Sequence, residues 1–151
     1  LGGYLCDKLS MRDIRWYMWM PGLGFLIAVP FGVGVFTVDS VALSLLLYTM
    51  PAFLVNLYTG PTFGITQSLA PLAMRSAASA LLLFIINIIG LVFGPTTVGF
   101  ISDLLYESWQ MSDVESLRIA LLATNFVYLI SFTNYYLGSR HLRADLQRAN
   151  A

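Results

Sequence analysis

The hydrophobic positions of this chain fall into four long runs separated by short polar segments. The runs cover about residues 16–36, 41–66, 76–102 and 117–137. A helix needs about 20 mostly apolar residues to cross the hydrocarbon layer of a membrane, and inside lipid it satisfies its own backbone polar groups. The pattern therefore predicts an all-α integral membrane protein with four transmembrane helices, followed by a polar tail over residues 139–151.

The charged residues predict how these helices are oriented. Four crossings place the N-terminal segment, the loop near Arg75 and the tail on one side, and this side holds seven of the eight Lys and Arg residues. Arg118 lies on the other side, together with five acidic residues. Because Lys and Arg accumulate on the cytoplasmic side of membranes, we expect both ends of this segment in the cytoplasm and the chain in a bacterial inner membrane.

The second run has one polar face and one apolar face when its residues are placed at about 100° intervals. Pro51 and Pro61 each remove a backbone donor, so we expect both to bend or loosen this helix, which membranes tolerate where a helix lines a cavity. The polar face then borders a substrate path; alternatively, its side chains only bond to neighbouring helices. The candidate path residues are Tyr48, Thr49, Asn56 and Thr59, together with Asn87 of the third run.

The third run carries a narrow stripe of small and polar residues at spacings of three and four. Gly90 and Gly94 form a Gly-x-x-x-Gly pattern within it. Small residues let membrane helices approach closely, so we interpret these two glycines as helix-packing positions. Asn87 lies on the same stripe and is either a polar tie between helices or a contact to a ligand.

Composition narrows the possible functions. The chain is 58% hydrophobic and 11% charged, with a net charge of zero, so it has no overall basic field that would attract nucleic acid. One cysteine and one histidine are far short of a metal cluster, and the usual hydrolase and nucleotide motifs are absent from the sequence. We therefore predict no enzymatic activity, no cofactor and no metal. Since Leu1 is not an initiator Met and no basic signal start precedes the first run, we also expect an upstream part to be missing.

The opening residues resemble a loop motif of the major facilitator superfamily. In that motif a Gly-x-Leu-x-Asp sequence is followed by a basic residue, a small residue and an Arg. The matching positions here are Gly3, Leu5, Asp7, Lys8, Ser10 and Arg12. A second stretch, LAPLAMRSAASALLLFIINIIGLVFGPTTVGFISDLL over residues 69–105, resembles the eleventh-helix region of the Spinster-like branch of the same superfamily.

The resemblance implies a position in a larger protein. The chain would be the end of helix eight followed by helices nine to twelve of a twelve-helix secondary transporter, with helices ten and eleven bordering a central cavity. Its partners would be membrane lipid and the missing N-terminal half, and its substrate a lysolipid-like amphiphile or a small organic anion. Gly3, Asp7, Lys8 and Arg12 would form a gating motif, a cytoplasmic latch made in one state of alternating access and broken in the other.

Two other classes of protein remain open on the sequence. The first is a complete four-helix membrane subunit or scaffold that binds a partner through the stripe of Gly90 and Gly94. Reading the gene upstream of Leu1 separates this subunit from a transporter, because the transporter requires about eight further spans. The second, a membrane enzyme acting on lipids, is disfavoured because no nucleophile and base lie together in the sequence.

Overall fold

The computed structural model describes residues 2–149, and these residues form a helical bundle without a β-strand among them. Four helical paths in this part of the chain are long and apolar enough to cross a membrane. The all-α fold with four membrane-length helices, predicted from the hydrophobic pattern, is therefore confirmed. Residues 1, 150 and 151, at the edges of the predicted domain and tail, lie outside the described residues. The elements are α1 (Gly2–Ser10), α2 (Trp16–Thr37), α3 (Val41–Asn56), α4 (Thr59–Leu69), η1 (Leu72–Met74), α5 (Arg75–Asn87), η2 (Ile88–Phe93), α6 (Gly94–Trp109), α7 (Asp113–Asn125) and α8 (Val127–Ala149).

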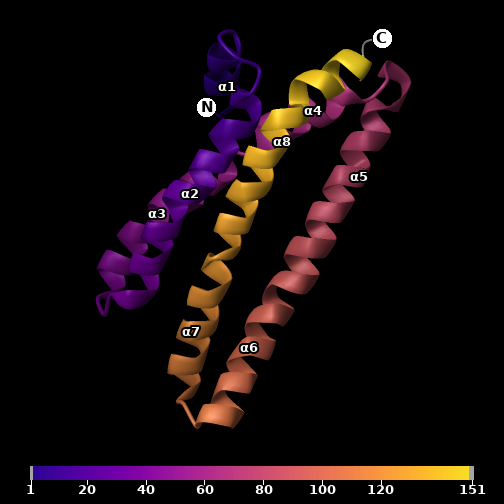
Figure 1. The fold of residues 1–151 in the computed structure, drawn as a ribbon. Helices are drawn as coiled ribbons and strands as arrows, with labels where there is room; N and C mark the ends of the chain where they lie inside the picture. The colour runs from indigo at the N-terminus through magenta and orange to yellow at the C-terminus, as the bar shows by residue number, and fades with distance from the viewer. Residues whose placement is uncertain (1, 150–151) are drawn as a thin grey trace.

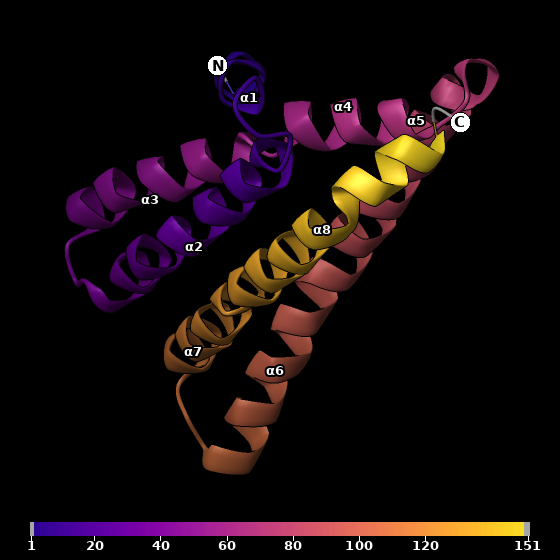
Figure 2. The ribbon, with the colours of Figure 1, turned by 45° about the horizontal axis from the view of Figure 1, so that its top comes forward.

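The four helical paths are α2, α3–α4, η1–α5–η2–α6 and α7–α8. They alternate in direction, so the two ends of the chain lie at the same end of the molecule (Figure 1). In the described part, α2 packs most extensively against α3 and α8. The α5–η2–α6 path stands apart from α2 and α3 in both ribbon views, and its main contacts with the rest of the bundle are with α4 at one end and α7 at the other (Figure 2). The first, second and fourth paths thus form a packed group, with the third path beside it.

The second path is broken between α3 and α4. Pro61 has no N–H, so the carbonyl of Leu57 has no donor four residues further on, and the break falls at Leu57 and Tyr58. The expectation for Pro61 is confirmed by this break. No break falls at Pro51, because α3 continues through it with its side chain buried, and the bend expected there stays a prediction.

The third path changes its helical type in the middle. The segment η2 is π-helical and ends directly before Gly94 and Pro95. Pro95 cannot donate to the carbonyl of Leu91, and a π-helical turn is one way to accommodate the missing bond. The stripe of small residues predicted for this path therefore includes a turn of irregular helix.

The fourth path begins with a side-chain cap. The hydroxyl of Ser112 accepts a hydrogen bond from the backbone N–H of Glu115 at 3.3 Å, as in a capping box. The path is interrupted at Phe126, between α7 and α8, and α8 then runs through the segment predicted as a polar tail as far as its last described residue. Asn125 thus lies at the end of a helix in the middle of an apolar path.

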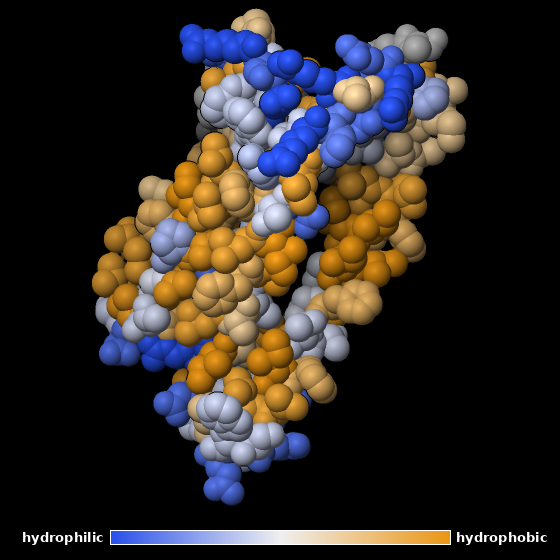
Figure 3. Space-filling model, in the orientation of Figure 1, coloured by the Kyte–Doolittle hydropathy of each residue, from blue (hydrophilic) through white to orange (hydrophobic). Residues whose placement is uncertain are grey.

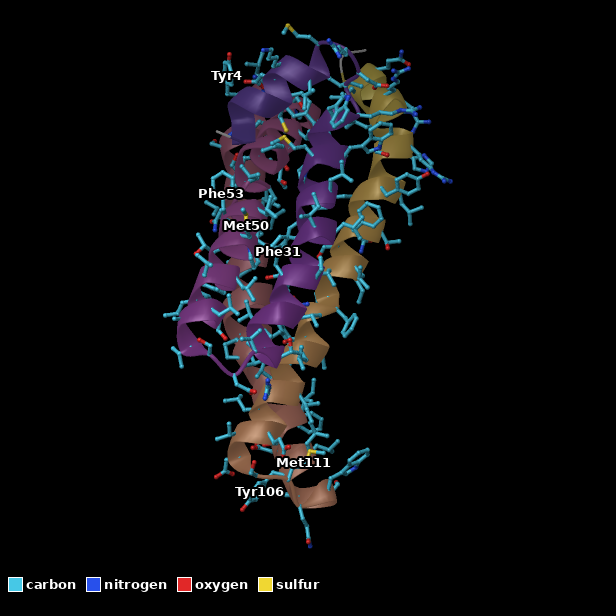
Figure 4. All side chains as sticks on the ribbon, turned by 90° about the vertical axis from the view of Figure 1, so that its left-hand side faces the viewer. Tyr4, Phe31, Met50, Phe53, Tyr106 and Met111 are labelled. Carbon is cyan, nitrogen blue, oxygen red and sulfur yellow. The ribbon has the colours of Figure 1, made fainter. Side chains whose placement is uncertain are left out.

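The surface of the molecule has an apolar waist and polar ends (Figure 3). Met50 and Phe53 lie along α3 and are about half exposed, and Tyr4 and Tyr106 lie at opposite ends of the molecule (Figure 4). A water-soluble protein rarely exposes an apolar surface of this extent. The apolar middle of the molecule is therefore suited to contact lipid, and the polar residues at its two ends are suited to contact water.

Candidate functional site

The predicted gating motif lies on α1 and on the turn that follows it. The carboxylate of Asp7 accepts a hydrogen bond from the hydroxyl of Tyr17 on α2 at 2.7 Å. The hydroxyl of Ser10 donates to the backbone carbonyl of Asp7 at 2.9 Å. An added Cβ at Gly3 would meet no atom within 4 Å, and the side chain of Leu5 lies outside the described residues. Asp7 is therefore the member of the motif that joins α1 to the next helix.

The two cations of the motif have a different environment. Lys8 and Arg12 are exposed, and neither forms an ion pair within the described part of the chain. Together with Leu9 and Met11 they line a cavity of about 490 Å³. The structure thus separates the motif into an acid engaged by Tyr17 and two cations that face an open cavity.

A second set of polar contacts at this end was not singled out from the sequence. Asp13 forms an ion pair with Arg143 of α8, with 3.1 Å between Oδ1 and Nη2. The same oxygen accepts the backbone N–H of Arg15 at 3.0 Å. The pKa of Asp13 is lowered, chiefly by this backbone hydrogen bond; desolvation opposes the shift, and the hydrogen bond and charge of Arg143 lower the pKa further. An Asp that bonds two residues ahead is a turn signal that the sequence carries, but its pairing with Arg143 is not visible there.

At the opposite end of the molecule, another set of polar contacts joins the first path to the last. Arg118 of α7 forms an ion pair with Asp39 at 3.8 Å, and its Nε donates to the carbonyl of Phe36 at the end of α2. Arg118 is the cation that the orientation rule left on the acidic side. It supplies a donor to a helix C-terminus, where the carbonyls have no donor within the helix.

A third tie lies between these two, in the apolar part of the molecule. The amide of Asn125 donates to the carbonyl of Val29 on α2 at 3.0 Å. Asn125 is buried and is seated against Gly32, where any Cβ would overlap its amide. Polar side chains that bond across helices add to packing within a membrane. The pair of Asn125 and Gly32 is thus a position where helix contact depends on one glycine, and no periodicity in the sequence singled it out.

Aromatic side chains hold the break of the second path against its neighbours. The ring of Phe25 lies 5.7–5.8 Å from the rings of Tyr58, Tyr128 and Tyr135. The hydroxyl of Tyr135 shares a hydrogen bond with the hydroxyl of Thr62 at 2.7 Å. This aromatic cluster fixes the start of α4 against α2 and α8, so the break has a defined position in the bundle.

The five predicted path residues are all exposed in the described chain. No hydrogen bond among the described residues joins two of their side chains. Four of them donate to main-chain carbonyls near them in sequence, which leaves their acceptor atoms open to the surroundings. The bonds are Thr49 to Leu45 at 3.2 Å, Asn56 to Ala52 at 2.7 Å, Thr59 to Asn56 at 2.6 Å and Asn87 to Leu83 at 2.8 Å, while Tyr48 is 57% exposed.

The predicted packing positions on the third path line a cavity. A space of about 620 Å³ lies between η2–α6 and α7–α8, and both Gly90 and Gly94 border it. An added Cβ at either glycine would meet no atom within 4 Å. The close helix packing predicted for these glycines is therefore not made by the described residues, and on this stretch the third path is open to a neighbour or to a ligand. The other residues of the lining are Phe36, Ile89, Phe93, Thr97, Val98, Leu121, Thr124, Asn125, Val127 and Tyr128.

These features define a class of protein: a polytopic helical membrane protein with broken helices and a cavity between its third and fourth paths. The chain is similar to an MFS-type efflux pump of Mycolicibacterium smegmatis, with 31% identity over 144 residues. The match covers 95% of this chain and 33% of the pump, so the chain spans about a third of the length of this relative. No family model matches the chain. No solved structure matches it significantly.

The similarity to this pump supports the major facilitator superfamily resemblance found in the sequence. It also supports a transporter as the general class of function. The Spinster-like branch stays a prediction that rests on the residues quoted for it.

Proposed function

We propose that this chain is the C-terminal part of a secondary active transporter that works by alternating access. The observation that carries the proposal is the similarity to an efflux pump along 95% of the chain. The chain would supply helices nine to twelve, preceded by the end of helix eight, and its partner would be the remaining part of the same transporter. The third path supports such a partner. The apolar middle of this path has few neighbours among the described residues, so a long surface is available to another helix.

The polar face of the second path supports the proposed route of the substrate. The residues that would border this route are exposed, and no hydrogen bond among the described residues joins two of their side chains. They are Tyr48, Thr49, Asn56, Thr59 and Asn87. The lysolipid-like amphiphile and the small organic anion are both compatible with hydroxyl and amide groups among aliphatic residues. The name of the pump favours transport outward, and the charge distribution favours the end that carries α1 as the cytoplasmic one.

The hydrogen bond between Asp7 and Tyr17 supports the proposed latch. In a latch that opens and closes, the carboxylate must exchange partners as the helices move, and an exposed hydrogen bond is easily exchanged. In the complete transporter, Asp7→Asn should reduce flux strongly while the protein is still inserted into the membrane. Asp103→Asn is a matched control, because it removes the same charge from an exposed Asp on α6, at the opposite end. Equal flux in both variants would remove Asp7 from the mechanism.

The direct test of the proposal uses the complete gene product in liposomes. Flux of lysolipids and of small organic anions is compared under imposed proton and sodium gradients, with the direction of the gradient reversed in parallel samples. Gradient-dependent flux of one substrate class supports the transporter. A gene product with only these four spans, and with no flux in any condition, would contradict it and leave the four-helix subunit.

A further inference from the structure

The two acids of α1 and its following turn form no ion pair with Lys8 or Arg12 among the described residues. The carboxylate of Asp7 is engaged by Tyr17, and that of Asp13 by Arg143 and by a backbone N–H. Lys8 and Arg12 have no ion pair within the described residues. Lys8 and Arg12 are therefore two cations without a carboxylate partner in the described chain on one short segment, while Asp7 keeps its negative charge and directs its carboxylate to Tyr17.

The turn after α1 keeps these two cations on the same cavity. The backbone N–H of Arg12 donates to the carbonyl of Leu9 at 3.0 Å, so the chain continues for a further turn beyond the end of α1. Residues four apart on a helical turn are neighbours on its surface, and both cations line the cavity of about 490 Å³. The segment thus presents a pair of donors at one location rather than two scattered charges.

The same cavity has an apolar component. Leu9 and Met11 complete its lining, and the side chain of Met11 is 81% exposed. Tyr4 is 70% exposed and precedes Lys8 by four residues on α1. Exposed apolar side chains would not contribute to the binding of free phosphate in water. Basic, apolar and aromatic side chains together are instead typical of the membrane–water interface.

The position of the cavity relative to the spans is consistent with that interface. Trp16 and Trp19 begin α2 directly after the turn, and their rings meet edge to face at 5.8 Å. Tryptophan at the start of a membrane-length helix marks the level of the lipid headgroups. Arg12 precedes Trp16 by four residues and Lys8 by eight, so we expect both cations near the level of the lipid phosphates.

We propose that the cavity formed by Lys8, Leu9, Met11 and Arg12 binds the headgroup of an anionic phospholipid of the bilayer. The phosphate accepts from Lys8 and Arg12, and one acyl chain lies along Leu9 and Met11. Arg12 offers a fork of donors and Lys8 a point charge, a combination that suits a phosphate at a surface. The site recognises a lipid of the surrounding membrane rather than the transported substrate.

The test measures lipid binding to the complete gene product, purified in a neutral detergent. Native mass spectrometry counts bound phosphatidylglycerol during a titration, with phosphatidylcholine as the neutral comparison. The decisive variant is Lys8→Gln/Arg12→Gln. Two basic residues near an anionic lipid surface contribute enough that losing both should weaken phosphatidylglycerol binding about 30-fold. Lys8→Arg should retain the binding, because the charge is kept.

A matched control removes two cations elsewhere. Arg75→Gln/Arg140→Gln changes the net charge by the same amount and should leave the binding nearly unchanged. Equal losses in the two double variants would overturn the proposal in favour of diffuse attraction. Displacement of the lipid by equimolar inorganic phosphate would assign the site to free phosphate, and equal binding of both lipids would exclude recognition of the anionic headgroup. Because all substituted side chains are exposed, the variants are expected to fold, which circular dichroism and gel filtration check.

Because this assay records binding without flux, its failure and the failure of the transporter proposal are distinguishable. Lipid binding is read from the mass spectra alone, because Lys8 and Arg12 also belong to the proposed latch and their substitution is expected to change flux as well. Wild-type protein that transports substrate but shows no preference for phosphatidylglycerol overturns the lipid site alone.

Discussion

Replacing Gly32 with alanine should destabilise the contact between the first and last paths. A Cβ at this position would overlap Oδ1 of Asn125 and would lie 2.7 Å from its amide carbon and 2.9 Å from its amide nitrogen. Atoms cannot remain at these separations, so the amide must rotate away. The rotation breaks the hydrogen bond to the carbonyl of Val29.

The size of the effect follows from what the rotation removes. A hydrogen bond between membrane helices contributes about 0.6 kcal/mol on average and up to about 1.7 kcal/mol. Overpacking of a close contact adds about 1–3 kcal/mol. We therefore expect Gly32→Ala to lower the free energy of unfolding by about 2–5 kcal/mol.

The measurement is reversible unfolding of the complete gene product in mixed micelles, with increasing SDS and tryptophan fluorescence as the signal. Gly99→Ala is the matched control, because a Cβ there meets nothing within 4 Å. That control should be neutral or slightly stabilising, since alanine is favoured over glycine in a helix by about 0.5–1 kcal/mol.

A double-mutant cycle separates the steric cause from a general effect on the helix. In an Asn125→Ala background the obstructing amide is gone, so adding Gly32→Ala should cost almost nothing. The two single losses would then be strongly non-additive, as expected for residues in contact. Additive losses, or a Gly32→Ala protein as stable as the Gly99→Ala control, would refute the reasoning.

Three further predictions concern the polar contacts. Cys6 should react slowly with maleimide in the folded protein and fully after denaturation, because its buried side chain has a pKa raised to about 11 by burial and then by the charge of Asp7; rapid labelling at pH 7 would contradict this burial. The ion pair of Asp13 and Arg143 should contribute a small, salt-dependent stability, abolished by Arg143→Gln. Since the pKa of Asp13 is lowered in the folded protein, that contribution should be complete at pH values above the unfolded-state value of about 3.9 and disappear on further acidification; a pH-independent difference between wild type and variant would exclude it. Thr62→Val should cost about 1 kcal/mol by removing the partner of the Tyr135 hydroxyl, and the loss should vanish in a Tyr135→Phe background if this hydrogen bond is its cause.

The sequence predicted the parts of the fold that depend on local pattern. Hydrophobic runs of spanning length predicted the four paths, and the missing N–H of Pro61 predicted the break in the second one. At Pro51 the helix continues, because a proline interrupts only one hydrogen bond and packing decides whether the helix breaks there. Local chemistry therefore located where a helix could break, and the tertiary contacts determined where it does.

The candidate site was predicted less completely, for a different reason. The ties of Asn125 to Val29 and of Arg143 to Asp13 join residues about a hundred or more positions apart, and no spacing in a single sequence reports such a pairing. The Gly-x-x-x-Gly pattern of Gly90 and Gly94 predicts a closely packed neighbouring helix, yet no atom of the described residues would lie within 4 Å of a Cβ at either glycine. A helix pattern indicates which face is ready for contact, while the contact depends on a partner elsewhere in the chain or outside it.

The packing of α8 against α2 has a consequence for biosynthesis. The ribosome delivers α2 first and α8 last, so one side of α2 has no protein neighbour until the whole segment has been inserted. During that interval Gly22, which is buried against Phe132 and Tyr135 in the finished bundle, faces lipid. Release of the chain before α8 would leave a membrane-inserted but unclosed intermediate, the kind of species that membrane quality-control proteases recognise. The packing of α2 is thus completed only when α8 has been inserted.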